Sequence, residues 1–346
     1  MAPILKNEAA WLRASGAYPL EIGPGPQPDP AEDEVVIKVS YAAANPLDWR
    51  LQDGLPFPMD FPNILGADVA GTVVQLGSKV TRFQLGQRVL GLCNGLVVNK
   101  RANSGWQRYS TCPEILVSAI PDSLPLANAA VLPLSISTAT TALFVHLGLQ
   151  LPSLAPNPVG ETVLIWGGSS SCGSSAIQLA VAAGYEVATT ASTSNFDYVK
   201  SLGASHVFDH TDPKVVEKVL QVLKPGDHVF DCISNAQTMK TSATILGRIG
   251  GGKLALLNPP ENSYAENVKP IHIFAWDPAM TGSDVGDAVL RKYFPAALAE
   301  GKIQAKPDPI IIEGGLETVQ YGIDLLKRGV SAKKIVIEIA KEELSP

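Results

Sequence analysis

The chain of 346 residues is long enough for two domains, each with a hydrophobic core of its own. Because 46% of the residues are hydrophobic and 17% are charged, the composition excludes disorder for most of the chain. The net charge of −6 argues against nucleic acid or an anionic membrane surface as the main partner.

The cysteines and the apolar segments indicate where the protein works. The four cysteines, at positions 93, 112, 172 and 232, lie too far apart for the Cys-x-x-Cys spacing of structural zinc. Isolated thiols of this kind are typical of a reducing compartment. No apolar run resembles a signal peptide or approaches the length of a membrane span, so we expect a cytoplasmic protein.

The first third of the chain has the pattern of β-structure. Short runs rich in β-branched residues, at 34–42, 69–76 and 88–92, are separated by glycines, which predicts a small barrel. The composition changes near Leu132, and an Ala/Thr/Leu-rich stretch at 135–149 predicts a helix.

From residue 162 onward, strand and helix patterns alternate every ten to fifteen residues, which predicts a doubly wound parallel sheet. The strands are expected at 162–166, 186–190, 206–209, 228–232 and 253–257, and the helices at 174–183, 196–202, 215–223 and 238–246.

The last part of the chain predicts helices at 289–300 and 316–329 and a strand at 334–339. That strand alternates like one exposed on a single face, and we expect it to return to the first domain. The predicted domains are therefore residues 1–130 with 290–346, and residues 131–289.

A glycine- and serine-rich turn at 167–173 lies between a buried strand and a helix. Small residues there let the backbone approach a pyrophosphate, and the helix N-terminus offers free N–H groups and the positive end of its dipole. The alternative is a plain flexible turn, but the strand–turn–helix context favours a dinucleotide. The predicted cofactor contacts are Gly167, Gly168, Ser169, Ser170, Ser171 and Cys172.

The end of the next strand distinguishes between the two nicotinamide cofactors. An NAD-binding protein places an acid there for the ribose 2′-OH, whereas this chain has no carboxylate until Asp197. The hydroxyl and amide groups of Ser192, Ser194 and Asn195 suit a 2′-phosphate, so the sequence favours NADPH. Helix capping by Ser194 or Asn195 would produce part of the same pattern.

The chain resembles the medium-chain dehydrogenase/reductase superfamily over nearly its whole length. Asn-Pro-Leu-Asp at 45–48 and the blocks at 65–71 and 77–89 resemble its quinone oxidoreductase and enoyl reductase branch, and above all the fungal trans-acting enoyl reductases. Further matching motifs lie at 137–139, 167–169, 195–197, 231–235 and 257–259. The resemblance implies an α/β protein in which a GroES-like β-barrel catalytic domain is joined to a Rossmann domain.

The resemblance also bears on zinc. Zinc-dependent members have a cysteine at the position of Asn45 and a histidine–glutamate pair at the positions of Ala67 and Asp68. Neither Asn45 nor Ala67 supplies a ligand that Zn²⁺ prefers, so we expect no catalytic metal.

Without a metal, the implied chemistry is hydride transfer from NADPH to an enone, enoyl thioester or quinone. The catalytic residues are expected to be Asp48, Arg50 and Thr138. By resemblance, further cofactor contacts are Asn45, Leu47, Trp49, His210, Leu257, Asn258, Val330 and Ser331, and the substrate contacts are Ala139, Leu143, His146 and Trp276.

Several of these residues have a second interpretation. Arg50, where the enoyl reductases have lysine, either stabilises an enolate or is an ordinary surface cation. Asp48 is either an acid or the residue that stabilises the Asn-Pro turn. His210 stands where relatives have tyrosine; it either binds the 2′-phosphate or is a loop histidine. His146 either faces substrate or packs within its helix, and Trp276 either lines the substrate mouth or forms a sheet edge.

Three functions are consistent with these residues. The first is an NADPH-dependent reductase of activated double bonds, with a small molecule or an acyl thioester as substrate and, by resemblance, a polyketide synthase as partner. The second is a non-catalytic NADPH-binding sensor or scaffold, and the third is a zinc-free carbonyl or alcohol reductase. Monomers and dimers both occur among the relatives, so the sequence leaves the oligomeric state open between a monomer and a homodimer.

Overall fold

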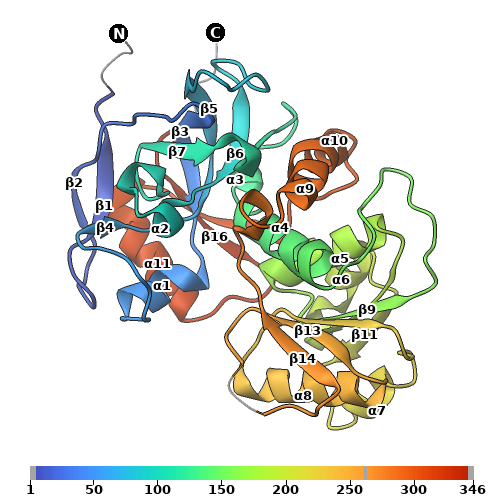
Figure 1. Cartoon of the computed structure of the whole chain (residues 1–346). Helices are drawn as coiled ribbons and strands as arrows, with labels where there is room; N and C mark the ends of the chain where they lie inside the picture. Colours follow the sequence, from blue (N-terminus) through green and yellow to red (C-terminus); the bar gives the residue numbers. More distant parts are fainter. Residues whose placement is uncertain (1–4, 261–262, 342–346) are drawn as a thin grey trace. The chain divides into compact units, whose positions relative to one another are not determined.

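The computed structural model describes residues 5–260 and 263–341, and the chain divides into two compact units. The first joins Met1–Leu134 to Asp308–Pro346, and the second is Ser135–Pro307. Figure 1 shows the first unit as the blue and cyan strands with the red strand β16, and the second as the green to orange elements.

The first unit is built on β-sheet. In the described chain, one sheet has the order β15-β16-β3-β5-β6-β8 with β7 beside β3, and another has the order β2-β1-β4. The β-branched side chains of β3, such as Val35, Ile37 and Val39, are fully buried in its core. The strands are β1 (Glu8–Leu12), β2 (Glu21–Pro24), β3 (Glu34–Ala43), β4 (Asn63–Ile64), β5 (Asp68–Leu76), β6 (Arg88–Leu92), β7 (Tyr109–Pro113), β8 (Val117–Ala119), β15 (Pro309–Ile312) and β16 (Lys334–Glu338).

Short helices accompany these sheets. The longest of those described in the first unit, α11, packs its buried residues Val319 and Ile323 on the sheet core. The helices are α1 (Pro46–Gln52), α2 (Gly95–Val98), α3 (Leu126–Ala129) and α11 (Val319–Lys327), with 3₁₀ turns at Arg101–Asn103, Glu114–Leu116 and Gly315–Thr318.

The second unit is a parallel sheet with the strand order β11-β10-β9-β12-β13-β14. The order reverses between β9 and β12, and ligands of such sheets bind at the carboxyl ends of the strands at this point. In Figure 1, α5 and α6 lie above the sheet and α7 and α8 below it. The strands are β9 (Thr162–Trp166), β10 (Glu186–Ala191), β11 (His206–Asp209), β12 (His228–Asp231), β13 (Gly252–Leu256) and β14 (Val268–His272).

The helices of this unit follow the strands as the alternating pattern predicts. α4 crosses the boundary between the units, since it begins at Pro133. The helices of the second unit are α4 (Pro133–Thr140), α5 (Ser171–Ala182), α6 (Phe196–Ser201), α7 (Val215–Val219), α8 (Ala236–Arg248), α9 (Ser283–Gly286) and α10 (Phe294–Ala299). The unit also has π-helical turns at Thr141–His146 and Asp287–Tyr293 and 3₁₀ turns at Thr193–Asn195 and Asp277–Ala279.

The chain leaves the second unit at Asp308, eighteen residues after the predicted boundary at 290. Side chains explain the difference, because Lys302 Nζ donates to the Leu154 carbonyl (2.7 Å) and the Gln304 N–H donates to Gln178 Oε1 (2.7 Å). The helix predicted at 289–300 is a π-helical turn followed by α10, which has Pro295 in its first turn. Proline has no N–H to donate, so a regular α-helix cannot pass through it.

The stretch Leu126–His146 corrects the expectation that no segment approaches a membrane span. An 18-residue window of it has a mean hydropathy of 1.4, so by length and composition it could cross a membrane. However, 83% of that window is buried inside the protein, as in the core helix of a globular protein.

The final strand, β16, was expected to have one exposed face. It lies between β15 and β3, and Lys334, Ile335, Val336 and Ile337 are all buried. The alternation of polar and apolar residues was therefore misleading, because Lys334 is a buried charge rather than a solvent-facing one.

Candidate active site

The turn after β9 is tied to the neighbouring strand. The Gly167 N–H donates to Thr190 Oγ1 (2.9 Å), and the Gly168 N–H donates to the Thr190 carbonyl (2.9 Å). Ser170 is the N-cap of α5: its Oγ accepts from the Gly173 N–H (3.0 Å) and donates to the Gly167 carbonyl (2.8 Å). These bonds give the turn one defined shape before any ligand arrives.

Two glycines are required for that shape. A Cβ on Gly168 would lie 2.1 Å from Thr189 Oγ1, and one on Gly173 would lie 2.3 Å from the Gly167 carbonyl oxygen. Ordinary van der Waals contacts of a Cβ begin near 3.4 Å, so both positions exclude larger residues. The helix start and the strand end therefore pack closely enough to expose backbone rather than side chains.

The turn has the donors that an anion needs. Within the described chain, the backbone N–H groups of Ser169, Ser171 and Cys172 have no hydrogen-bond acceptor. They lie at or beside the N-terminus of the twelve-residue helix α5, where the helix dipole is positive. Free N–H groups in this place fit a pyrophosphate, so the residues of the turn fit a dinucleotide.

At the end of β10, two of the predicted 2′-phosphate residues come together. Ser192 Oγ lies 3.2 Å from His210 Nε2, and His210 is exposed. The carboxylate of Asp209 is also near, on β11, but it accepts the N–H (2.9 Å) and hydroxyl (2.8 Å) of Thr211. These bonds lower the pKa of Asp209, so the carboxylate caps its own turn. Ser194 and Asn195 lie in the adjoining 3₁₀ turn.

The ends of β12 and β13 form a second polar cluster. Asp231 Oδ1 accepts the N–H groups of Ile233 and Ser234 (2.9 Å each), and burial raises the pKa of this aspartate. Ser234 then accepts the Leu257 N–H at its Oγ (2.8 Å) and the Asn258 amide at its carbonyl (2.7 Å). Leu257 and Asn258, predicted to contact the nicotinamide, are thus held at the carboxyl end of β13, the strand beside β12.

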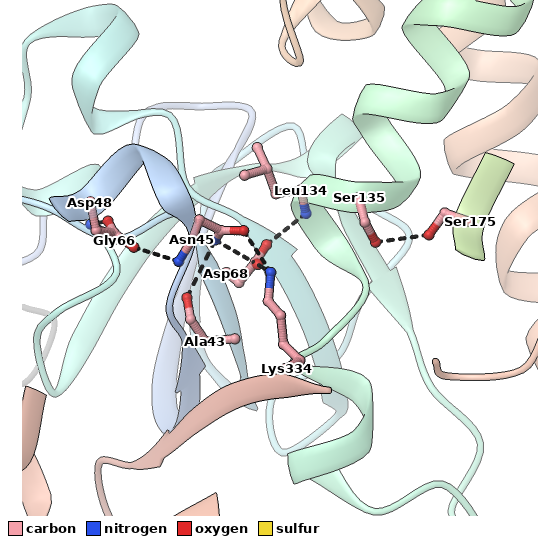
Figure 2. A network of polar contacts seen from close by, with 9 residues as sticks. All are labelled: Ala43, Asn45, Asp48, Gly66, Asp68, Leu134, Ser135, Ser175 and Lys334. Carbon is pink, nitrogen blue, oxygen red and sulfur yellow. Dashed lines mark hydrogen bonds and ion pairs between the residues drawn. The ribbon is translucent and has the colours of Figure 1, made fainter. Parts of the chain in front are cut away.

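The helix that contains Thr138 is bound to the segment 274–277. Ser137 Oγ donates to the Ala275 carbonyl, and Thr141 Oγ1 donates to the Phe274 carbonyl (3.3 Å). His146 Nε2 lies 3.0 Å from Asp277 Oδ2. His146 therefore pairs with a carboxylate of its own unit, which favours the packing interpretation of this histidine. Figure 2 shows a further link, between Ser135 Oγ and Ser175 Oγ (2.8 Å).

Three residues predicted to line a substrate site are buried in the structure. Ala139 and Leu143 have no exposed surface, and Trp276 is 4% exposed and lies against Phe274. Side chains packed to this degree expose little or no surface in this structure, so their contact with a substrate stays a prediction. Thr138, one turn of helix from Leu143, is also nearly buried at 8%.

In the first unit, Asp48 is an internal cap. Its Oδ2 accepts the Asn45 N–H (2.8 Å), and its Oδ1 accepts the Gly66 N–H (3.1 Å). The side chain is buried, and its loss of hydration, opposed by the hydrogen bonds, raises the pKa of Asp48 to about 6. The arrangement favours the turn-stabilising interpretation of Asp48, which holds the start of α1 against the segment before β5.

Beside it lies a buried ion pair (Figure 2). Lys334 Nζ is 3.0 Å from Asp68 Oδ2 and donates to Asn45 Oδ1 (2.5 Å). Asp68 Oδ2 also accepts the Asn45 amide (2.8 Å), and its Oδ1 accepts the Leu134 N–H (2.6 Å). Lys334 and Asp68 are 3% and 0% exposed. We did not expect either residue to be functional from the sequence.

The rest of α1 carries the other predicted residues of this unit. Arg50 lies with its guanidinium 5.5 Å from the centre of the Trp49 ring, and Lys327 Nζ is 5.7 Å from the same ring. Both Trp49 and Arg50 are half-buried, as is Leu47. Two further predicted cofactor contacts, Val330 and Ser331, lie between α11 and β16; Val330 is half-buried and Ser331 is exposed.

Comparison with known proteins identifies the family. Residues 31–122 match the alcohol dehydrogenase GroES-like domain, and residues 172–301 match the zinc-binding dehydrogenase family. The chain is 56% identical to the trans-enoyl reductase himH of Aspergillus japonicus, over 98% of this chain and 99% of that protein. The chain belongs to the medium-chain dehydrogenase/reductase superfamily.

Two further similarities agree with this assignment. The dehydrogenase orsE of Emericella nidulans is 37% identical over 96% of this chain and 99% of that protein. The crystal structure of the CurK enoyl reductase has the same fold, with a TM-score of 0.78 at 20% identity over 96% of this chain and 99% of that one. The predicted fold class is confirmed, and the protein is an oxidoreductase of a nicotinamide-dependent superfamily.

The zinc implied by one family description does not fit the residues of this member. At the positions that the resemblance aligns with zinc ligands, this chain has an amide, a methyl group and a carboxylate, and the amide and carboxylate are bound to Lys334. Among the described residues, no group of three or more His, Cys, Asp or Glu side chains is placed to hold a metal ion. The ion pair of Lys334 and Asp68 is the feature of this medium-chain reductase that sequence reasoning missed; the single Lys at the start of a buried strand was the signal.

Proposed function

We propose that the protein is a zinc-independent reductase that uses NADPH to transfer hydride to an activated carbon–carbon double bond. The observation that carries the proposal is the 56% identity with a trans-enoyl reductase over 98% of the chain. Enones, enoyl thioesters and quinones share a β-carbon or ring position at which hydride addition gives a stabilised enolate. The proposed hydride acceptor is therefore any compound with an electron-poor double bond of this kind.

The turn after β9 would hold the pyrophosphate of the cofactor. The N–H groups of Ser169, Ser171 and Cys172 would donate to its oxygens, with the dipole of α5 behind them. The bound nicotinamide supplies the hydride. Leu257 and Asn258, fixed through Ser234, would contact the nicotinamide end, because they lie at the carboxyl end of β13, beside β12.

The preference for NADPH rests on the end of β10. Ser192 and His210 place a hydroxyl and an imidazole within 3.2 Å of each other, and the nearby carboxylate of Asp209 is engaged by Thr211. A phosphate dianion would accept hydrogen bonds from both groups and would favour the protonated imidazole. Direct titration tests the preference: NADPH should bind more than tenfold tighter than NADH, or about 1.4 kcal/mol. Equal affinities would contradict it.

Stabilisation of the developing enolate would fall to Arg50. Its guanidinium is held over Trp49, and a guanidinium is a delocalised cation that does not readily give up a proton. The same property makes it a poor proton donor, so the proton that completes the reaction would come from solvent. In this proposal Thr138 contacts the carboxamide, and an acyl thioester would reach the enzyme on a polyketide synthase, as the resemblance to trans-acting enoyl reductases implies.

Anaerobic stopped-flow with NADPH tests the reaction. The full-length protein is mixed with a panel of enones, quinones, acyl thioesters and aldehydes, and NADPH oxidation is followed by absorbance. We expect turnover with at least one activated alkene or quinone. Tight NADPH binding without turnover on any acceptor would support a sensor instead, and turnover of aldehydes alone would support a carbonyl reductase.

A further inference from the structure

A tyrosine on α6 reaches the helix that follows the pyrophosphate turn. Tyr198 Oη lies 2.8 Å from Oγ of Ser174, a residue of α5 that has no exposed surface. Tyr198 itself is half-buried and comes three residues after Asn195, the N-cap of α6. The two hydroxyl groups therefore connect α6 directly with α5.

The other contacts of Ser174 determine the direction of this bond. Its Oγ is also 2.8 Å from the Ser170 carbonyl oxygen and 3.2 Å from the Gly168 carbonyl oxygen, and carbonyls can only accept. A serine hydroxyl has one proton to donate, so that proton is directed at these carbonyls. The Ser174 oxygen is left to accept, and the Tyr198 hydroxyl donates to it. The tyrosine thus binds a serine that lies against the backbone of the pyrophosphate turn.

The backbone of Tyr198 belongs to the segment that is proposed to bind the 2′-phosphate. Ser194 and Asn195 lie in the 3₁₀ turn directly before α6, and the Asn195 N–H donates to the Ser192 carbonyl (2.8 Å). Side chains of a helix point back toward its N-terminus, so the Tyr198 ring leans toward this turn. One side chain therefore joins the predicted 2′-phosphate segment to the predicted pyrophosphate segment.

We propose that Tyr198 is a positioning residue for NADPH, which fixes the separation of these two subsites by holding the start of α6 against α5. The inference rests on the NADPH preference of the proposed function and names a residue that enforces it without touching the cofactor. Two subsites of one ligand both bind well only at the separation that the ligand dictates, and supporting hydrogen bonds hold such geometry. NADH has no 2′-phosphate, so its affinity depends much less on this separation.

Cofactor titration of the full-length Tyr198→Phe protein tests the proposal. The ring still packs in this variant, and only the hydroxyl is lost. We expect NADPH to bind about fivefold more weakly, the factor that corresponds to one neutral hydrogen bond, and NADH to keep its affinity. Ser174→Ala also removes the contacts with Gly168 and Ser170, so it should weaken the binding of both cofactors.

Tyr185→Phe is the matched control. Tyr185 lies in the same unit, directly before β10 and so at the opposite end of that strand from Ser192, and its hydroxyl accepts the Gln150 N–H (3.2 Å). This variant also loses one hydroxyl and one hydrogen bond, and we expect its ratio of NADPH to NADH affinity to equal that of the parent. If Tyr198→Phe keeps the parent's ratio, or loses affinity for both cofactors equally, its role is only structural and the proposal is overturned.

Hydrogen exchange followed by mass spectrometry tests the positioning without any cofactor. The amides of residues 192–197 should exchange about fivefold faster in Tyr198→Phe than in the parent, because the start of α6 opens more readily without the bond to α5. The same amides should exchange at the parent's rate in Tyr185→Phe. Unchanged exchange in Tyr198→Phe overturns the proposal.

The two measurements separate this inference from the proposed function, and neither needs turnover. Equal affinities of the parent for NADPH and NADH would contradict the NADPH preference, and the exchange rates would still decide whether Tyr198 holds the start of α6. A parent that prefers NADPH, together with an unaltered Tyr198→Phe protein, would overturn the role of Tyr198 and leave the reductase function standing.

Discussion

Gly173→Ala is the most direct perturbation of the cofactor turn. The new Cβ would lie 2.3 Å from the Gly167 carbonyl oxygen and 2.7 Å from the Gly168 Cα, both backbone atoms of the turn itself. Relief requires a movement of about 1 Å in that backbone, and overpacking of this kind costs about 1–3 kcal/mol. Alanine recovers up to about 1 kcal/mol of helix propensity, so we expect a net loss of roughly 1–2 kcal/mol.

Gly247→Ala is the matched control, because Gly247 is also a helical glycine of the second unit. Its Cβ would meet Val268 at 3.5 Å and Asn267 at 3.6 Å, which are ordinary contacts. Here alanine should stabilise by about 0.5–1 kcal/mol, since only the propensity term remains. The two variants should therefore move the melting temperature in opposite directions.

The assay combines thermal unfolding with NADPH titration. For a domain of this size 1 kcal/mol corresponds to about 2–4 °C, so Gly173→Ala should melt about 2–8 °C below the parent. Displacing the N–H groups of Ser169, Ser171 and Cys172 should also weaken NADPH binding at least tenfold in Kd, or by about 1.4 kcal/mol. If Gly173→Ala binds NADPH as tightly as Gly247→Ala does, the turn is not the pyrophosphate site.

Three further predictions concern single side chains. In titrations, His210→Ala should weaken the binding of NADPH but not that of NADH. His206→Ala, at the other end of β11, should change neither affinity. Equal losses of affinity for both cofactors would exclude recognition of the 2′-phosphate by His210. Arg50→Ala should lower kcat, and Arg50→Lys should retain most of it. Arg13→Ala is the control, because Arg13 also lies over a tryptophan. An Arg50→Ala protein with unchanged kcat would make Arg50 a surface cation. The pKa of Asp48 is raised to about 6, so its contribution to stability is present below pH 4 and is lost as the pH rises through 6. Relative to Asp48→Asn, the unfolding free energy of the parent should therefore fall by up to about 3 kcal/mol between pH 4 and 7 in urea titrations, and a constant difference would contradict the raised pKa.

The second unit was predicted well because its signals are local. A fully apolar strand, a turn of small residues and a helix that ends at glycine determine the structure around Gly167 within about twenty residues. The doubly wound parallel sheet also follows from the alternation of strands and helices, because such connections are right-handed and short. Edge strand β14 was missed, since Pro270 interrupts its apolar pattern and proline is tolerated mainly at a sheet edge.

The contacts within the first unit were harder to predict, since they join residues far apart in the sequence. Asn45, Asp68 and Lys334 come from three separate segments, and no spacing rule relates them. The motif at 45–48 was recognised, but the alternation of charged and apolar residues in 334–338 indicated a solvent-facing lysine. A buried charge has the same sequence pattern as an exposed one, and only its partner distinguishes them.

The burial of the residues predicted to contact substrate was not expected from the sequence. Ala139 and Leu143 were taken from the resemblance by position along a helix, and a helix exposes different residues once part of it widens. For Leu143, the π-helical turn at Thr141–His146 changes the angular spacing of the side chains that follow Thr140, so a register assumed from an α-helix no longer applies. Thr138 precedes the π-helical turn and keeps its place in α4, so the prediction that it contacts the nicotinamide carboxamide does not depend on the changed register.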